Sequence, residues 1–132
     1  MTIGRRDVEG IAILDLEGRL MAGSDSSLLR ERIVDLANQK QISLILNLKR
    51  VEFIDSTGLG TMVMCFTALQ KQGGALKLLH LSKRQIELLV LTKLTTIFEV
   101  FDDEQDAINS FFPDREVRHF DILNFVKGRE KP

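Results

Sequence analysis

The chain has 132 residues, of which 44% are hydrophobic, and this is the size and composition of one globular domain. Its formal net charge is −1, from 18 basic and 19 acidic residues, so it lacks the basic surface that nucleic-acid binding usually needs. No apolar run approaches the ~20 residues that span a bilayer, and the N-terminus lacks the apolar segment of a signal peptide. We therefore expect a soluble cytoplasmic protein that binds neither nucleic acid nor membrane.

The first third of the chain predicts two strands, a helix and a third strand. Residues 11–16 are typical of a buried strand, and Glu9–Gly10 would turn that strand back against a weaker one over residues 2–8. Residues 18–23 are typical of a loop. Three serines are candidates to cap the helix that follows: Ser24, Ser26 and Ser27. Its buried side would carry Leu29, Ile33, Leu36 and Ala37. The next strand is predicted over residues 43–48.

The rest of the chain continues the alternation of helices and strands. The helix after Asp55 has a clear 3.6-residue period, on the face formed by Leu59, Met62, Val63, Phe66 and Leu69. A strand over residues 75–81 leads to Ser82, which with Gln85 forms a capping box for a helix buried by Ile86, Leu89 and Val90. Residues 95–101 are rich in β-branched and aromatic side chains and predict a last strand. Acids at 102–104 would begin a final helix, buried by Ala107, Ile108 and Phe111 and ended by Pro113.

The predicted order is β-β-α-β-α-β-α-β-α, which favours an α/β fold. Strands joined through helices pair in parallel, and the first two strands, joined by a tight turn, pair antiparallel. We therefore expect a single domain over residues 1–113, with a mixed, mostly parallel sheet covered by helices. Residues 114–132 form a C-terminal extension that is too apolar for a free tail. We expect it to be helical and to pack on its own domain or across a homodimer, with docking to another partner as the alternative.

The residue pattern offers no metal site, no cofactor site and no catalytic constellation. His80 and His119 are the only histidines and Cys65 is the only thiol, so no metal-ligand spacing is present. Cys65 lies among apolar residues and is expected to be a core side chain. The glycines at 58 and 60 form neither a dinucleotide-binding fingerprint nor a phosphate-binding loop. We therefore expect a protein that is not an enzyme.

The segment Asp55-Ser56-Thr57-Gly58 is the strongest candidate for a functional site. It follows a predicted parallel strand and begins the next helix, and partners of such sheets tend to meet the loops beyond these strand ends. Helix N-termini present free N–H groups and a partial positive charge. Two interpretations are open: one of the three polar residues caps the helix while Gly58 permits close packing, or Ser56 carries a phosphate.

The segment LILNLKRVEFIDSTGLGTMV resembles the signature of the STAS domain, the fold of bacterial anti-sigma factor antagonists. The resemblance runs from about residue 5 to residue 112. It includes LEGRL before the first helix, GGALKLLHLSKRQIELLVLTKL after the signature and IFEVFDDEQDAINSF at the end.

The resemblance implies that the protein is switched by phosphorylation. The serine directly after the aspartate, here Ser56, would be phosphorylated by a partner that is both a kinase and the anti-sigma factor; Thr57 is an alternative acceptor. The unphosphorylated form would capture the anti-sigma factor and free the sigma factor. A serine phosphatase is a second candidate partner. The residues implied in partner binding are Arg19, Met21, Ser24, Asp55, Ser56, Thr57, Gly58, Leu59 and Met62.

Two features of the chain differ from the resembled pattern. Met21-Ala22-Gly23 occupies a loop in which many antagonists carry an acid that helps to engage the kinase. The extension after Pro113 continues past the usual end of the domain. These differences keep an alternative open, in which the protein is a STAS scaffold or a regulatory subunit of a transport or stress-signalling complex.

Overall fold

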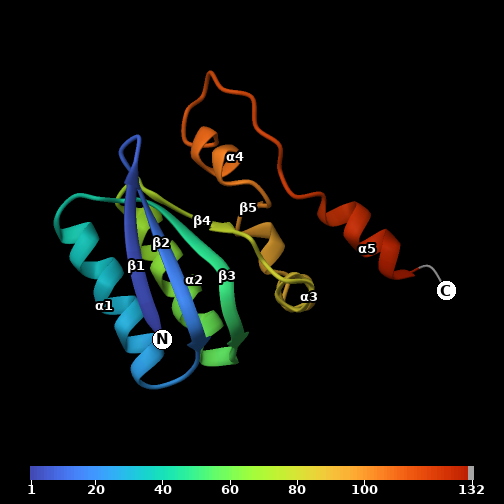
Figure 1. Cartoon of the computed structure of the whole chain (residues 1–132), viewed down its shortest axis with the longest axis horizontal. Helices are drawn as coiled ribbons and strands as arrows, with labels where there is room; N and C mark the ends of the chain where they lie inside the picture. Colours follow the sequence, from blue (N-terminus) through green and yellow to red (C-terminus); the bar gives the residue numbers. More distant parts are fainter. Residues whose placement is uncertain (131–132) are drawn as a thin grey trace.

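The computed structural model describes the backbone of residues 1–130 and the side chains of residues 1–126. Its centre is a five-stranded sheet whose strands lie in the order in which they occur in the chain (Figure 1). The strands are β1 (Thr2–Val8), β2 (Ile11–Leu20), β3 (Ser43–Ile54), β4 (Ala75–Leu79) and β5 (Val100–Phe101). The α-helices are α1 (Ser24–Asn38), α2 (Ser56–Lys71), α3 (Lys83–Leu91), α4 (Glu104–Asn109) and α5 (Ile122–Glu130).

Strand directions follow the connections between strands. β1 pairs antiparallel with β2 across the tight turn at Glu9–Gly10, and β2, β3, β4 and β5 pair in parallel. Each connection between parallel strands contains a helix, because the chain has to return to the other end of the sheet before the next strand begins. The predicted mixed, mostly parallel α/β fold is therefore confirmed.

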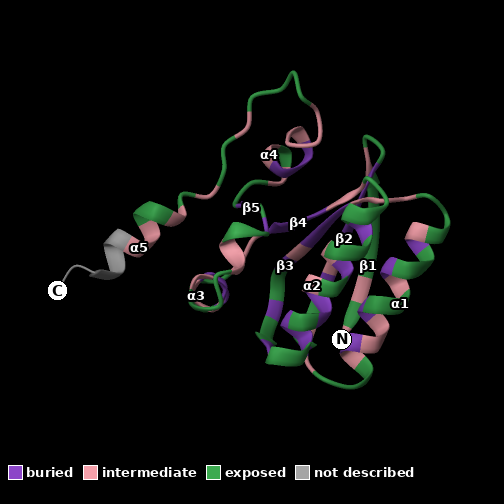
Figure 2. Cartoon of the chain, turned by 180° about the vertical axis from the view of Figure 1, so that it is seen from behind, coloured by how far each residue is buried: buried purple, intermediate pink, exposed green. Residues whose placement is uncertain are grey.

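Alternating side chains divide the core between the two faces of the sheet. Leu14, Leu46 and Leu78 belong to the larger cluster, which includes buried residues of α1, α2 and α3. Their neighbours along the strands, such as Ile13 and Ile45, belong to a smaller cluster that α4 covers. Figure 2 shows the buried residues along the strands and on the inner sides of α1 and α2. In the described residues, no helix is long and apolar enough to cross a bilayer.

The strands β2 and β3 are longer than predicted. β2 runs through half of the predicted loop to Leu20, and β3 runs six residues past the predicted end, to Ile54. The added parts pair with each other through two register irregularities. Several residues of these parts are exposed, so their sequence lacks the apolar run from which a strand was predicted. This extension brings the end of β3 directly to the start of α2.

Three other local predictions were wrong. A strand was predicted over residues 95–101, but only Val100–Phe101 pair with β4. The residues before them include a short 3₁₀ helix (Leu94–Thr96), which follows Lys93 in a left-handed conformation. No serine caps α1: Gly23 precedes the helix, and the Ser26 hydroxyl donates to the Met21 carbonyl at 2.8 Å. Helix α4 ends at Asn109, four residues before Pro113. The predicted capping box of α3 is confirmed.

The C-terminal extension contacts its own domain in its described part. Arg115 pairs with Glu9 at 2.9 Å, and the Phe120 N–H donates to the Val100 carbonyl at 3.1 Å. Phe120 and Phe125 pack against the larger core cluster. Helix α5 lies at the far end of the molecule from α1 (Figure 1). A boundary between domain and extension at residue 113 stays a prediction.

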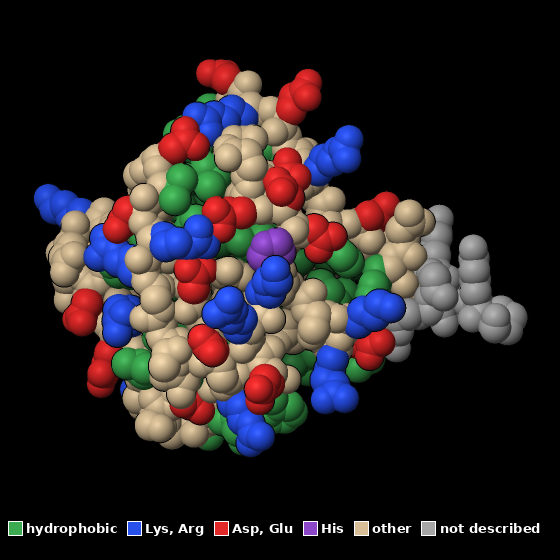
Figure 3. All heavy atoms as spheres, viewed as in Figure 1, with side chains coloured by type: hydrophobic (Ala, Val, Ile, Leu, Met, Phe, Trp, Pro, Cys, Tyr) green, Lys and Arg blue, Asp and Glu red, His purple; other side chains and the backbone are tan. Residues whose placement is uncertain are grey.

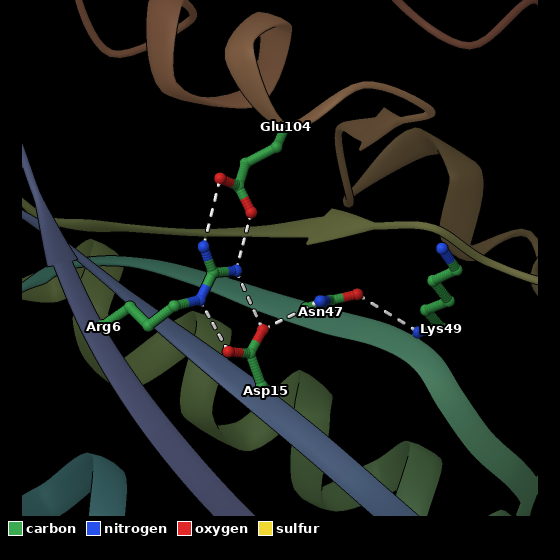
Figure 4. A network of polar contacts seen from close by, with 5 residues as sticks. All are labelled: Arg6, Asp15, Asn47, Lys49 and Glu104. Atoms are coloured by element: carbon green, nitrogen blue, oxygen red, sulfur yellow. Dashed lines mark hydrogen bonds and ion pairs between the residues drawn. The ribbon is translucent and has the colours of Figure 1, made fainter.

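A polar network joins α4 to the strands (Figure 4). The Arg6 guanidinium contacts Asp15 at 2.6 Å and Glu104, the first residue of α4, also at 2.6 Å. Asn47 donates to Asp15 at 2.8 Å. The hydrogen bonds from Arg6 hold the pKa of Asp15 below its usual range. Figure 3 shows this side of the molecule with basic and acidic side chains interspersed rather than gathered in one patch.

Candidate functional site

Asp55 links three segments of the chain at the end of the sheet. It lies between β3 and α2, and its carboxylate accepts from the Gly58 N–H at 2.7 Å, which makes it the cap of α2. The other carboxylate oxygen accepts from the Ala22 N–H at 2.9 Å, in the loop between β2 and α1. These backbone hydrogen bonds lower the pKa of Asp55, first the one from Gly58 and then the one from Ala22. Asp55 is therefore an ionised group whose two oxygens are both occupied.

Ser56 is the first residue of α2, and its side chain is exposed. In the described part of the chain, no group forms a hydrogen bond with its hydroxyl. Thr57 is also exposed. Because Asp55 makes the cap, the helix start does not need the Ser56 side chain, which stays available for another role.

Gly58 fixes the distance between α2 and the end of β2. A Cβ at this position would lie 2.2 Å from the Leu20 carbonyl oxygen, which is closer than any real contact. The same carbonyl accepts from the Asp55 N–H at 3.2 Å. Only a residue without a side chain allows this approach, and this confirms that Gly58 permits close packing.

The residues predicted for partner binding fall into two groups. Arg19, Ser24, Ser56 and Thr57 are exposed around the ends of β2 and β3, and Met21 and Asp55 are partly buried beside them. In contrast, Gly58, Leu59 and Met62 are buried; the side chains of Leu59 and Met62 are 6% and 1% exposed. The buried three support the surface from below, so any part that they take in partner binding is indirect. The prediction included them because the resembled signature runs into the helix without separating its two sides.

A groove next to Ser56 was missed by the sequence analysis. It has a volume of about 420 Å³ and lies between the end of β3 and helix α3. Phe53 from β3 and Leu91 from α3 line it and are 42% and 73% exposed. Arg84 and Leu88 also line it, about two turns and one turn before Leu91 on the same helix face. The available signal was the apolar Phe53 two residues before Asp55, but the predicted strand stopped before reaching it.

The remaining chemical candidates lie away from this groove. Cys65 is buried in the core as predicted, and burial raises the pKa of its thiol to about 11. His119 is exposed, lies 3.5 Å from Glu99 and packs on the Phe101 ring. Among the side chains that the structure describes, no group of three potential metal ligands comes together.

Comparison with known proteins gives a consistent assignment. The model of the STAS domain matches residues 3–107, most of the chain. The anti-sigma-B factor antagonist of Bacillus subtilis strain 168 is 47% identical over 72 residues, which cover 54% of this chain and 65% of that protein. The match thus spans slightly less than two thirds of that relative's length. The anti-sigma F factor antagonist of Paenibacillus polymyxa is 26% identical over 100 residues, 75% of this chain and 85% of that protein.

Solved structures share the same fold. The crystal structure of TM1081 from Thermotoga maritima aligns with a TM-score of 0.77 at 25% identity, covering 82% of this chain and 92% of that one. The Bacillus protein SpoIIAA in its phosphorylated form aligns with a TM-score of 0.66 at 20% identity, covering 83% and 99%. The family model covers residues 3–107, and the strand order and the Asp-Ser-Thr-Gly turn at the end of β3 are consistent with it. The chain therefore belongs to the STAS domain family.

Proposed function

We propose that the protein is an anti-sigma factor antagonist, which binds its anti-sigma factor through the surface around Ser56 and is released when Ser56 is phosphorylated. The observation that supports this most strongly is the arrangement at the start of α2. Asp55 supplies the cap, and Ser56 keeps an exposed hydroxyl without a partner in the described residues. The two relatives above are antagonists of anti-sigma factors, and SpoIIAA has been solved with and without phosphate.

The proposed reaction is phosphoryl transfer from ATP, with the anti-sigma factor acting as the kinase. A bond forms between the Ser56 oxygen and the γ-phosphorus, and the bond from that phosphorus to the bridging oxygen of ADP breaks. ADP leaves, and the hydroxyl proton passes to a base of the kinase. This protein is the substrate and supplies the hydroxyl at the first residue of α2, next to the Asp55 cap.

The phosphate changes the charge of the surface without a need to refold it. It adds about −1.5 to −2 charges at neutral pH, next to the ionised Asp55 and in the groove that Phe53 and Leu91 line. The N-terminal end of α2 favours a negative charge at this position and compensates part of the repulsion. A partner that buries this surface would have to desolvate the phosphate, so its affinity falls.

Mass spectrometry after incubation with the kinase and ATP tests the acceptor. We expect phosphate on Ser56 in the wild type and in Thr57→Val, and none in Ser56→Ala. Because the Ser56 hydroxyl makes no hydrogen bond within the described residues, Ser56→Ala should melt at the wild-type temperature. Phosphate on Thr57 in the wild type would reject Ser56 as the acceptor.

Titration with the anti-sigma factor tests the switch. We expect Ser56→Asp to weaken binding at least tenfold, about 1.4 kcal/mol, and Ser56→Ala to bind like the wild type. Thr67→Asp, which adds the same charge at an exposed position further along α2, is the matched control and should bind normally. Equal binding by all the variants would refute the charge switch and favour the scaffold or transport-subunit alternative.

A further inference from the structure

The groove beside Ser56 is lined by four charged side chains, and only one of them is basic. Glu52, Asp55 and Glu87 are acidic, and Arg84 is the single cation among the lining residues. Arg84 is exposed and, within the described residues, makes no ion pair and no side-chain hydrogen bond.

Arg84 and Ser56 line the same groove from different helices. Ser56 lines it from the start of α2, and Arg84 lines it from the first turn of α3. A phosphate on Ser56 and the Arg84 guanidinium would therefore share one space of about 420 Å³. Arginine suits this contact, because its planar fork forms two parallel hydrogen bonds to phosphate oxygens.

We propose that Arg84 is the intramolecular receptor of the phosphate on Ser56, and that their contact closes the groove over Phe53 and Leu91. This inference rests on the proposed phosphorylation of Ser56 and adds a second element to it. Arg84, Leu88 and Leu91 line the groove from one face of α3, so the proposed contact would occupy the same groove as these apolar side chains. Phosphorylation then removes a partner's apolar contact as well as adding a repulsive charge.

The contact can be measured on the full chain with phosphoserine incorporated genetically at position 56, which requires no kinase. The second ionisation of the phosphate is followed by ³¹P NMR as the pH is raised. An adjacent guanidinium favours the dianion, so we expect the phosphate pKa in Arg84→Gln to be higher by about half a unit or more. Lys83→Gln is the matched control: it removes the same charge from the neighbouring position of α3, and Lys83 does not line the groove.

Closure of the groove has its own signal in the methyl resonances of Leu91. We expect them to shift on phosphorylation in the wild type and in Lys83→Gln, and to stay in place in Arg84→Gln. Equal phosphate titrations of Arg84→Gln and Lys83→Gln would overturn the inference, and so would Leu91 signals that shift without Arg84. Failure of the proposed function would look different. The kinase would not phosphorylate Ser56 of the unmodified chain, but the phosphate pKa of the incorporated phosphoserine would still differ between the wild type and Arg84→Gln.

Discussion

Replacing Gly58 with alanine should destabilise the domain, although alanine is the better helix former. The added Cβ would lie 2.2 Å from the Leu20 carbonyl oxygen and 2.9 Å from the Leu20 Cγ. Normal contact distances require the start of α2 to move away from β2 by about 1 Å. The Leu20 carbonyl also accepts from the Asp55 N–H, so the movement weakens that hydrogen bond.

The size of the effect follows from two opposing contributions. Overpacking costs about 1–3 kcal/mol, and a clash with backbone belongs near the upper end, because backbone cannot rotate away. Alanine in place of glycine inside a helix stabilises the folded state by about 1 kcal/mol through its higher helix propensity. We therefore expect the free energy of unfolding to fall by about 2 kcal/mol in Gly58→Ala.

Gly60→Ala in the same helix is the matched control. Nothing lies within 4 Å of the Cβ that this substitution adds, so only the helix-propensity gain remains. Urea unfolding followed by far-UV circular dichroism measures both variants, since the chain has no Trp or Tyr for fluorescence. The reasoning fails if Gly58→Ala is as stable as the wild type, or if both variants move in the same direction.

Three further predictions concern the network around Arg6, the response to acid and the C-terminal extension. Arg6→Gln should lower the unfolding free energy by about 1 kcal/mol, since it removes the ion pairs of two carboxylates, whereas Arg5→Gln, which removes the single pair with Asp7, should change little; urea unfolding compares them. The folded-state pKa of Asp15 is depressed, so its stabilisation is present above pH ~4 and lost as the pH falls further; in Asp15→Asn the melting temperature should fall less steeply below pH ~4. Truncation after Pro113 should lower the melting temperature in a thermal scan, because it removes Phe120 and Phe125, whose partial burial against the larger core cluster is worth roughly 1 kcal/mol each. An unchanged melting temperature and oligomeric state would instead indicate an extension that is free for other partners.

The fold was predictable because its main signals are local. The 3.6-residue period after Asp55 and the capping box at Ser82 predicted α2 and α3, and both helices are present. The prediction of a strand over residues 95–101 was wrong, because β-branched side chains favour extended backbone but do not show whether a neighbouring strand is available to pair with it. Only Val100 and Phe101 reach β4, and Phe98 is buried in the core without pairing as a strand.

The candidate site was only partly predictable. The position of Ser56 at the start of α2 followed from the order of strand, turn and helix. That Asp55 is the cap depended on the Gly58 and Ala22 N–H groups, and Ala22 is 33 residues away in the chain. The groove is formed where Phe53 of β3 and Leu91 of α3 lie close together, and the sequence of neither segment predicts that they meet.

The order of strands in the sheet also bears on how the chain is made. Each strand from β2 onward is placed beside the strand synthesised just before it, and none is inserted between two earlier ones. As the chain leaves the ribosome, at about 5–20 residues per second, the sheet can grow at one edge in the order of synthesis. The growing edge ends at β5, where the late-synthesised Phe120 hydrogen-bonds to Val100. Translation of the extension therefore adds one backbone hydrogen bond to the outer side of the edge strand β5.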